Sequence, residues 1–186
     1  TNVLQILDLS GIPLMSSDRS ENDPIVIGGG PCAYNPEPLA DFFDIFYIGE
    51  GEVSYDELID LYKDCRKKGL GRDEFLVRAS NIKGLYVPSI YAVSYNDDGT
   101  IKSFEPVHEN VPAKVVKTAV EAISDTSYPE KPIVPYIKAT QDRVVLEIQR
   151  GCIRGCRFCQ AGMVYRPVRE RSLEMLKNKA VKMLDS

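Results

Sequence analysis

The pattern of apolar and polar residues in the first half of the chain predicts two short buried strands joined by a helix. Residues 25–27 are apolar and run into a glycine turn at 28–30, and residues 45–48 are apolar and run into a second glycine-containing turn at 49–51. Short apolar runs that end in glycine turns are typical of strands in parallel sheets. The segment 37–43 between them predicts a brief helix, so the region is expected to form a βαβ unit.

Helices are predicted on both sides of this unit. Residues 3–9 place apolar side chains on one helix face, and Gly11 ends that helix. Ser54 and Glu57 have the spacing of a capping box, which predicts the start of a helix that stops at 68–69. The predicted buried face of this helix consists of Leu58, Leu61, Tyr62 and Cys65.

The middle of the chain predicts a β-hairpin followed by an extended linker. A short helix capped by Asp73 is expected first. Residues 84–95 and 101–104 are then strand-like, and the intervening segment 96–99 ends in Asp-Gly, which is a hairpin turn signal. Residues 105–140 contain repeated prolines, a composition that favours an extended and partly rigid linker.

Three cysteines near the end of the chain are the strongest candidates for chemistry. Residues 144–148 are apolar and predict a strand, and Cys152, Cys156 and Cys159 follow it at the spacing Cys-x-x-x-Cys-x-x-Cys. A closed zinc site needs four protein ligands, and the sole histidine, His108, is remote in sequence. Iron–sulfur clusters are also usually held by four thiolates. Three thiolates therefore indicate a [4Fe-4S] cluster that keeps one iron open.

This run resembles the signature of radical S-adenosylmethionine (SAM) proteins, in which an aromatic residue, here Phe158, precedes the third cysteine. The resemblance implies that Cys152, Cys156 and Cys159 hold the cluster and that its open iron binds SAM. It also implies that backbone around Phe158 faces the adenine, that SAM is cleaved to a 5′-deoxyadenosyl radical, and that a flavodoxin- or ferredoxin-like protein donates the electron. In that family a (β/α) barrel would follow, and Ser172 is predicted to cap its first helix.

A second resemblance covers the two glycine turns. The segments 26–31, 35–37 and 47–52 are similar to the later half of the cobalamin-binding domain that precedes many radical SAM barrels. The resemblance implies that the turns lie against cobalamin, and the residues concerned are Gly28, Gly29, Gly30, Gly49, Glu50 and Gly51. The Asp-x-His-x-x-Gly loop that supplies a cobalt ligand in such domains is absent. A Rossmann-like domain without a ligand is the alternative.

These observations predict an α/β protein in three parts. Residues 1–80 are expected to form a partial Rossmann-like cobalamin-binding domain, residues 81–140 a β-hairpin and proline-rich linker, and residues 141–186 the first β–loop–α unit of a radical SAM barrel. The chain begins at Thr1 and stops within a predicted helix, so we expect it to be a piece of a longer protein that is inactive by itself.

Composition and charge limit the binding partners and the cellular compartment that can be expected for this protein. The formal net charge of −4 gives no global case for nucleic acid, and no stretch of about 18 apolar residues predicts a membrane span. An odd number of cysteines argues against a secreted disulfide framework and predicts a cytoplasmic protein. Residues 150–171 are, however, locally rich in arginine. These arginines are expected either to meet a phosphate-bearing substrate, RNA or an anionic reducing partner, or to pair with carboxylates elsewhere in the protein.

Two other functions compete with SAM chemistry. An iron–sulfur electron-transfer protein would need no open iron and usually shows a fourth cysteine ligand. A zinc-binding interaction module would also need a further ligand from outside the loop. The sequence does not define the substrate.

Overall fold

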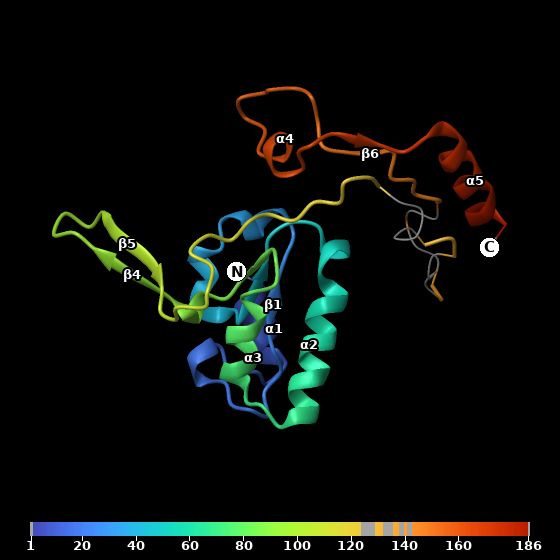
Figure 1. The fold of residues 1–186 in the computed structure, drawn as a ribbon. Helices are drawn as coiled ribbons and strands as arrows, with labels where there is room; N and C mark the ends of the chain where they lie inside the picture. The colour runs from blue at the N-terminus through green and yellow to red at the C-terminus, as the bar shows by residue number, and fades with distance from the viewer. Residues whose placement is uncertain (1, 124–128, 132–135, 138–139, 141–142, 186) are drawn as a thin grey trace. The chain divides into compact units, whose positions relative to one another are not determined.

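The computed structural model describes residues 2–123, 129–131, 136–137, 140 and 143–185. The chain divides into two compact units, Thr1–Ala119 and Val120–Ser186, called here the N-terminal and C-terminal units. Figure 1 shows the helices and strands of each. No helix among the described residues is long and apolar enough to cross a membrane.

A small mixed sheet forms the centre of the N-terminal unit. Strand β2 (Ile45–Tyr47) lies between β1 (Ile27–Gly28), to which it is parallel, and β3 (Leu85–Tyr86), to which it is antiparallel. All residues of β2 are buried, as the apolar run predicts. The link from β1 to β2 includes a 3₁₀ helix (Glu37–Phe42). The expected strand–helix–strand order is therefore present in this α/β unit.

The first strand differs from the prediction. Residues 25–27 were expected to form a fully buried strand, but β1 covers only Ile27 and Gly28, and Ile27 is exposed. The buried residue of the strand is Gly28, where a Cβ atom would be 2.9 Å from the ring of Phe46 and 3.0 Å from that of Phe43. The absence of a side chain lets the two rings close over the strand at this position.

The helices of the N-terminal unit are α1 (Asn2–Leu9), α2 (Tyr55–Lys68) and α3 (Arg72–Ala79). Helix α2 ends where the sequence predicts, because Gly69 takes the left-handed conformation with φ of 68°. On its predicted buried face, Leu58 and Cys65 are buried. Tyr62 meets Phe75 of α3 edge to face, with ring centroids 5.3 Å apart. The two helices thus pack through apolar and aromatic side chains.

Both predicted helix caps of this unit are wrong. Ser54 stands at the N-cap of α2, but its hydroxyl donates to the carbonyl oxygen of Lys83 at 3.1 Å and caps nothing. Asp73 lies inside the first turn of α3 and not before it. The Arg72 amide at the start of α3 donates instead to Oε1 of Glu21 at 2.7 Å. In each case a distant partner replaces the local interaction that the sequence pattern predicts.

The predicted hairpin is confirmed in part: of the strand expected over 84–95, residues 85–86 form β3 of the central sheet and residues 88–90 form a 3₁₀ helix, so only residues 91–95 belong to the hairpin. Strands β4 (Tyr91–Tyr95) and β5 (Ile101–Pro106) pair antiparallel, with an irregularity between Ser94 and Tyr95. Gly99 in the turn has φ of 81°, a conformation that favours glycine. Figure 1 shows the hairpin extending away from the sheet of its own unit.

In the C-terminal unit, β6 (Gln149–Arg150) pairs with β7 (Arg169–Glu170), and α4 (Ala161–Val164) and α5 (Leu173–Leu184) complete the elements. The cap of α5 is confirmed, since the Met175 amide donates to Oγ of Ser172 at 3.2 Å. The strand expected over residues 144–148 is shifted to 149–150. Its partner β7 runs antiparallel, whereas neighbouring strands of a (β/α) barrel are parallel.

Candidate functional site

The three clustered cysteines lie in the loop that joins β6 to β7. Cys152 and Cys159 are partly exposed, Cys156 is exposed, and all three are free thiols. The Cys159 amide donates to the carbonyl oxygen of Cys156 at 3.1 Å, which forms a tight turn between the second and third thiols. The Arg154 amide donates to Sγ of Cys152 at 3.4 Å. A backbone amide therefore donates a hydrogen bond at the first cysteine, and another does so between the second and third cysteines.

The donor set of this loop fits an iron–sulfur cluster. Within the described ranges, no group of three His, Cys, Asp or Glu side chains is already arranged around a metal position. The three cysteines nevertheless supply thiols that are reachable from solvent and not consumed in disulfides. Thiolates are the usual protein ligands of such clusters, and hydrogen bonds to sulfur tune them. The residues present are thus suitable for a [4Fe-4S] cluster with three protein ligands.

The two ends of the loop are held together by close backbone packing. Gly151 has φ of 83°, and a Cβ atom there would lie 2.7 Å from the carbonyl oxygens of Tyr165 and Pro167. Arg169 in β7 is buried and donates to the carbonyl oxygens of Pro167 at 3.0 Å, Val120 at 2.9 Å and Tyr165 at 3.3 Å. The cysteines therefore lie in a loop whose two ends are held together by backbone contacts and hydrogen bonds.

Glu147 joins two further arginines beside this base. Its carboxylate accepts from Nε of Arg150 at 2.8 Å and from Nη2 of Arg171 at 2.8 Å. Burial acts to raise the pKa of Glu147, but hydrogen bonds and charge from Arg150 and Arg171 outweigh it, so the pKa is lowered. These two arginines thus pair with a carboxylate of their own unit.

The tip of the loop carries exposed apolar and basic side chains. Phe158 is 92% exposed, and Ile153 is exposed as well. Arg154 and Arg157 are also exposed. Of the arginine-rich stretch, Arg150, Arg169 and Arg171 therefore have structural partners, whereas Arg154 and Arg157 face solvent and are available to a binding partner.

The first glycine turn has open space on one side. At Gly29 a Cβ atom would meet only the Cβ of Tyr47, at 4.0 Å. Gly30 has φ of 84°, and a Cβ atom there would have nothing within 4 Å. These two positions are accessible to a ligand, whereas Gly28 is covered by the rings of Phe43 and Phe46.

The second glycine turn is filled by the chain itself. A Cβ atom at Gly49 would collide with the backbone of Thr118, and one at Gly51 would collide with the ring of Tyr55. The Thr118 amide donates to the carbonyl oxygen of Ile48 at 3.0 Å, and the Glu50 amide donates to the carbonyl oxygen of Thr118 at 3.1 Å. Thr118 thereby adds a parallel bridge beside Gly49. The turn at 49–51 does not fit cobalamin in this conformation, because protein occupies the space.

A buried ionic network, which the sequence analysis missed, supports the same unit. Oδ2 of Asp44 lies 3.0 Å from Nη1 of Arg19 and 2.8 Å from Nη2 of Arg72, and it accepts from the Val26 amide at 2.6 Å. All three charged residues are buried. The partners are far apart in sequence and show no shared motif, so no local signal could have revealed them.

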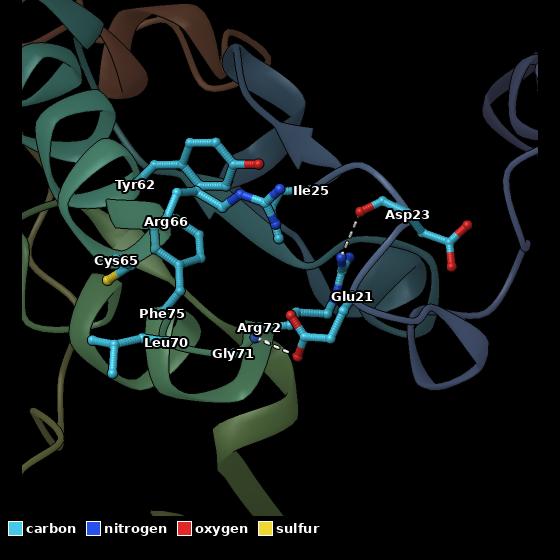
Figure 2. Close-up of a pocket in the computed structure, with 10 residues that line it drawn as sticks. All are labelled: Glu21, Asp23, Ile25, Tyr62, Cys65, Arg66, Leu70, Gly71, Arg72 and Phe75. Carbon is cyan, nitrogen blue, oxygen red and sulfur yellow. Dashed lines mark hydrogen bonds between the residues drawn. The ribbon is translucent and has the colours of Figure 1, made fainter. Parts of the chain in front are cut away.

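Beside this network is a small cavity of about 20 Å³. Figure 2 shows Glu21 and Arg72 at one end of it, and Tyr62 and Phe75 at the other. A volume of this size holds about one water molecule. The cavity is therefore a packing feature between α2, α3 and the loop before β1, and not a substrate pocket.

The comparisons with known proteins agree with the cysteine motif. Residues 1–88 match the family described as radical SAM proteins, N-terminal. An uncharacterised protein of Methanocaldococcus jannaschii is 31% identical over 162 residues, which cover 86% of this chain and 29% of that protein. The chain thus spans less than a third of the curated relative's length. No solved structure matches it significantly. The family match thus concerns the first 88 residues and ends before the cysteine loop.

Proposed function

We propose that Cys152, Cys156 and Cys159 hold a [4Fe-4S] cluster with which the protein cleaves SAM. The observation that carries the proposal is the set of three free, solvent-reachable thiols in one loop of a chain whose first 88 residues match radical SAM proteins. When bound, such a cluster supplies the electron for reductive cleavage of the carbon–sulfur bond of SAM to a 5′-deoxyadenosyl radical.

The chain's own residues prepare the loop for this role. Gly151 and Arg169 close its base, so the loop does not need the cluster to bring its two ends together. The Arg154 amide donates a hydrogen bond to Sγ of Cys152 and so holds that side chain in place. Glu147 in turn forms ion pairs with both Arg150 and Arg171. The exposed tip remains free to contact SAM and a partner.

Arg154 and Arg157 provide a surface for an electron donor. Their positive charge, next to the partly exposed Cys159, suits the acidic surface of a flavodoxin- or ferredoxin-like protein. The same charge would suit a phosphate-bearing substrate or RNA. We place the protein in the cytoplasm, because all five of its cysteines are free thiols.

The test uses the full-length protein that contains this chain, purified without oxygen. We expect brown protein with about four irons per chain, an EPR signal that SAM perturbs, and release of 5′-deoxyadenosine on reduction. Cys152→Ala, Cys156→Ala and Cys159→Ala should each abolish iron incorporation. Cys65→Ala, which changes a buried thiol in α2, and Cys32→Ala are the matched controls and should keep it.

Three outcomes would overturn the proposal. Full iron loading in any of the three loop variants would remove the assignment of ligands. Colourless protein that contains only zinc would indicate the interaction module instead. An intact cluster that neither responds to SAM nor yields 5′-deoxyadenosine would indicate an electron-transfer protein.

A further inference from the structure

A groove of about 430 Å³ opens at the carboxyl ends of β1 and β2 in the N-terminal unit. Tyr34 and Glu37 from the segment after β1 line it, together with Ile48, which directly follows β2. The hairpin contributes Phe104, and the segment before Thr118 contributes Lys114. Ligands of open α/β sheets bind at this edge, and the volume lies in the range of small-molecule sites.

An aromatic stack ends in this groove. The rings of Phe104 and Tyr91 are stacked, with centroids 5.2 Å apart and an interplanar angle of 15°. Tyr91 packs in turn on Tyr86 at 5.3 Å. Tyr86 and Tyr91 are buried, whereas Phe104 is 39% exposed. The stack therefore ends in a ring that is partly exposed in the groove, and aromatic rings of this kind are the groups on which proteins stack nucleobases.

Two charged groups of opposite sign line the same groove. Glu37 accepts a hydrogen bond from the phenol of Tyr86 at 2.6 Å, which holds its carboxylate in place. Burial, followed by this hydrogen bond and the charge of Glu37, raises the pKa of Tyr86, so the phenol remains a donor. Lys114 is exposed. The groove thus offers an acceptor for N–H groups and a cation for an anion.

The same edge does not fit a corrinoid. Thr118 is fully buried against Gly49, and its backbone bonds to Ile48 and Glu50 keep it there. Residues 113–115, which lead to it, line the groove. A cobalamin lying across both glycine turns would have to displace this segment. The groove volume of about 430 Å³ lies in the range of sites for small ligands.

We propose that this groove binds a nucleoside monophosphate, with the base on Phe104, a base N–H donating to Glu37, and the phosphate near Lys114. The nucleotide can be free or part of a single-stranded RNA, because both present the same chemistry. None of the residues that line this groove belongs to the cysteine loop.

The test is calorimetric titration of the full-length protein with AMP, adenosine and a short oligoadenylate. We expect AMP to bind, adenosine to bind more weakly, and Phe104→Ala to weaken AMP binding about tenfold or more, since it removes the stacking ring. Lys114→Glu should weaken AMP but leave adenosine unchanged. Ile101→Ala changes an exposed residue of the same strand that does not line the groove, and it should bind AMP as the wild type does.

The outcomes separate the possibilities. Oligoadenylate binding that needs Phe104 and Lys114 supports the proposal and identifies RNA as the source if it is tighter than AMP binding. The proposal would be overturned if neither AMP nor oligoadenylate binds. It would also be overturned if Phe104→Ala and Lys114→Glu leave AMP binding unaffected, or if hydroxocobalamin displaces AMP. Lys114 is exposed, so its variant tests the site even if Phe104→Ala misfolds. Cys152→Ala protein should bind AMP normally, which keeps this test independent of the proposed cluster.

Discussion

The guanidinium of Arg72 lies 2.8 Å from the carboxylate of Asp44, and only 8% and 2% of the two side chains are exposed. Asp44 also pairs with Arg19, whose side chain is fully buried. One carboxylate thus connects the loop before β1, the start of β2 and the start of α3. Such a site tolerates loss of one partner poorly, because the remaining charges stay buried without compensation.

Asp44→Ala should therefore lower the free energy of unfolding of the N-terminal unit by about 3–5 kcal/mol. Denaturant unfolding followed by circular dichroism measures the change. Asp60→Ala is the matched control, because it removes a carboxylate whose pairing with Lys63 is exposed, and it should cost no more than about 1 kcal/mol. Equal effects of the two substitutions would show that the buried network contributes little.

Gly49→Ala should be more damaging than Gly69→Ala. Both residues have positive φ, 125° and 68°, so each substitution carries a backbone cost of about 1–2 kcal/mol. At Gly69 a Cβ atom would have nothing within 4 Å, whereas at Gly49 it would collide with Thr118. Hydrogen exchange at the Thr118 amide should accelerate strongly in Gly49→Ala and little in Gly69→Ala. Unchanged protection in Gly49→Ala would mean that the bridge between Gly49 and Thr118 does not hold this segment.

Arg169→Ala should reduce iron loading of the full-length protein without removing a ligand. Its guanidinium donates to three carbonyl groups, those of Pro167, Val120 and Tyr165, and its loss removes these hydrogen bonds and leaves the loop ends less constrained. We expect lower iron content and a broadened EPR signal, with partial recovery in Arg169→Lys. The control is Lys177→Ala, which changes an exposed residue of α5. Iron content equal to wild type in Arg169→Ala would contradict this positioning role.

Low pH should reduce the folding stability of the C-terminal unit, because it protonates the carboxylate of Glu147. Because the pKa of this carboxyl is lowered in the folded protein, its pairing stabilises the fold above the unfolded pKa of about 4.3. That contribution is lost as the pH falls through the folded pKa. Glu147→Gln should therefore unfold at a lower temperature than wild type at pH near 7, and the difference should shrink below about pH 4. A difference that is independent of pH would exclude this ionic contribution.

Local signals in the sequence were sufficient for several elements. Gly69 ends α2, Ser172 caps α5, and the Asp-Gly turn at Gly99 joins β4 to β5, as predicted. The cysteine motif was also evident without a structure, and the family match over residues 1–88 lies outside it. Its role as a cluster site and the three-part domain division stay predictions.

The sequence by itself determined the structural features that depend on residues close to one another along the chain. These features are the end of α2 at Gly69, the cap of α5, the hairpin turn, the buried character of β2, and the spacing of Cys152, Cys156 and Cys159. The tertiary structure decided the partners across long separations: Lys83 for the hydroxyl of Ser54, Glu21 for the start of α3, and Thr118 for the space beside Gly49. A hydroxyl, a carboxylate or a glycine specifies which contacts are allowed, but only the folded chain brings one particular partner within reach.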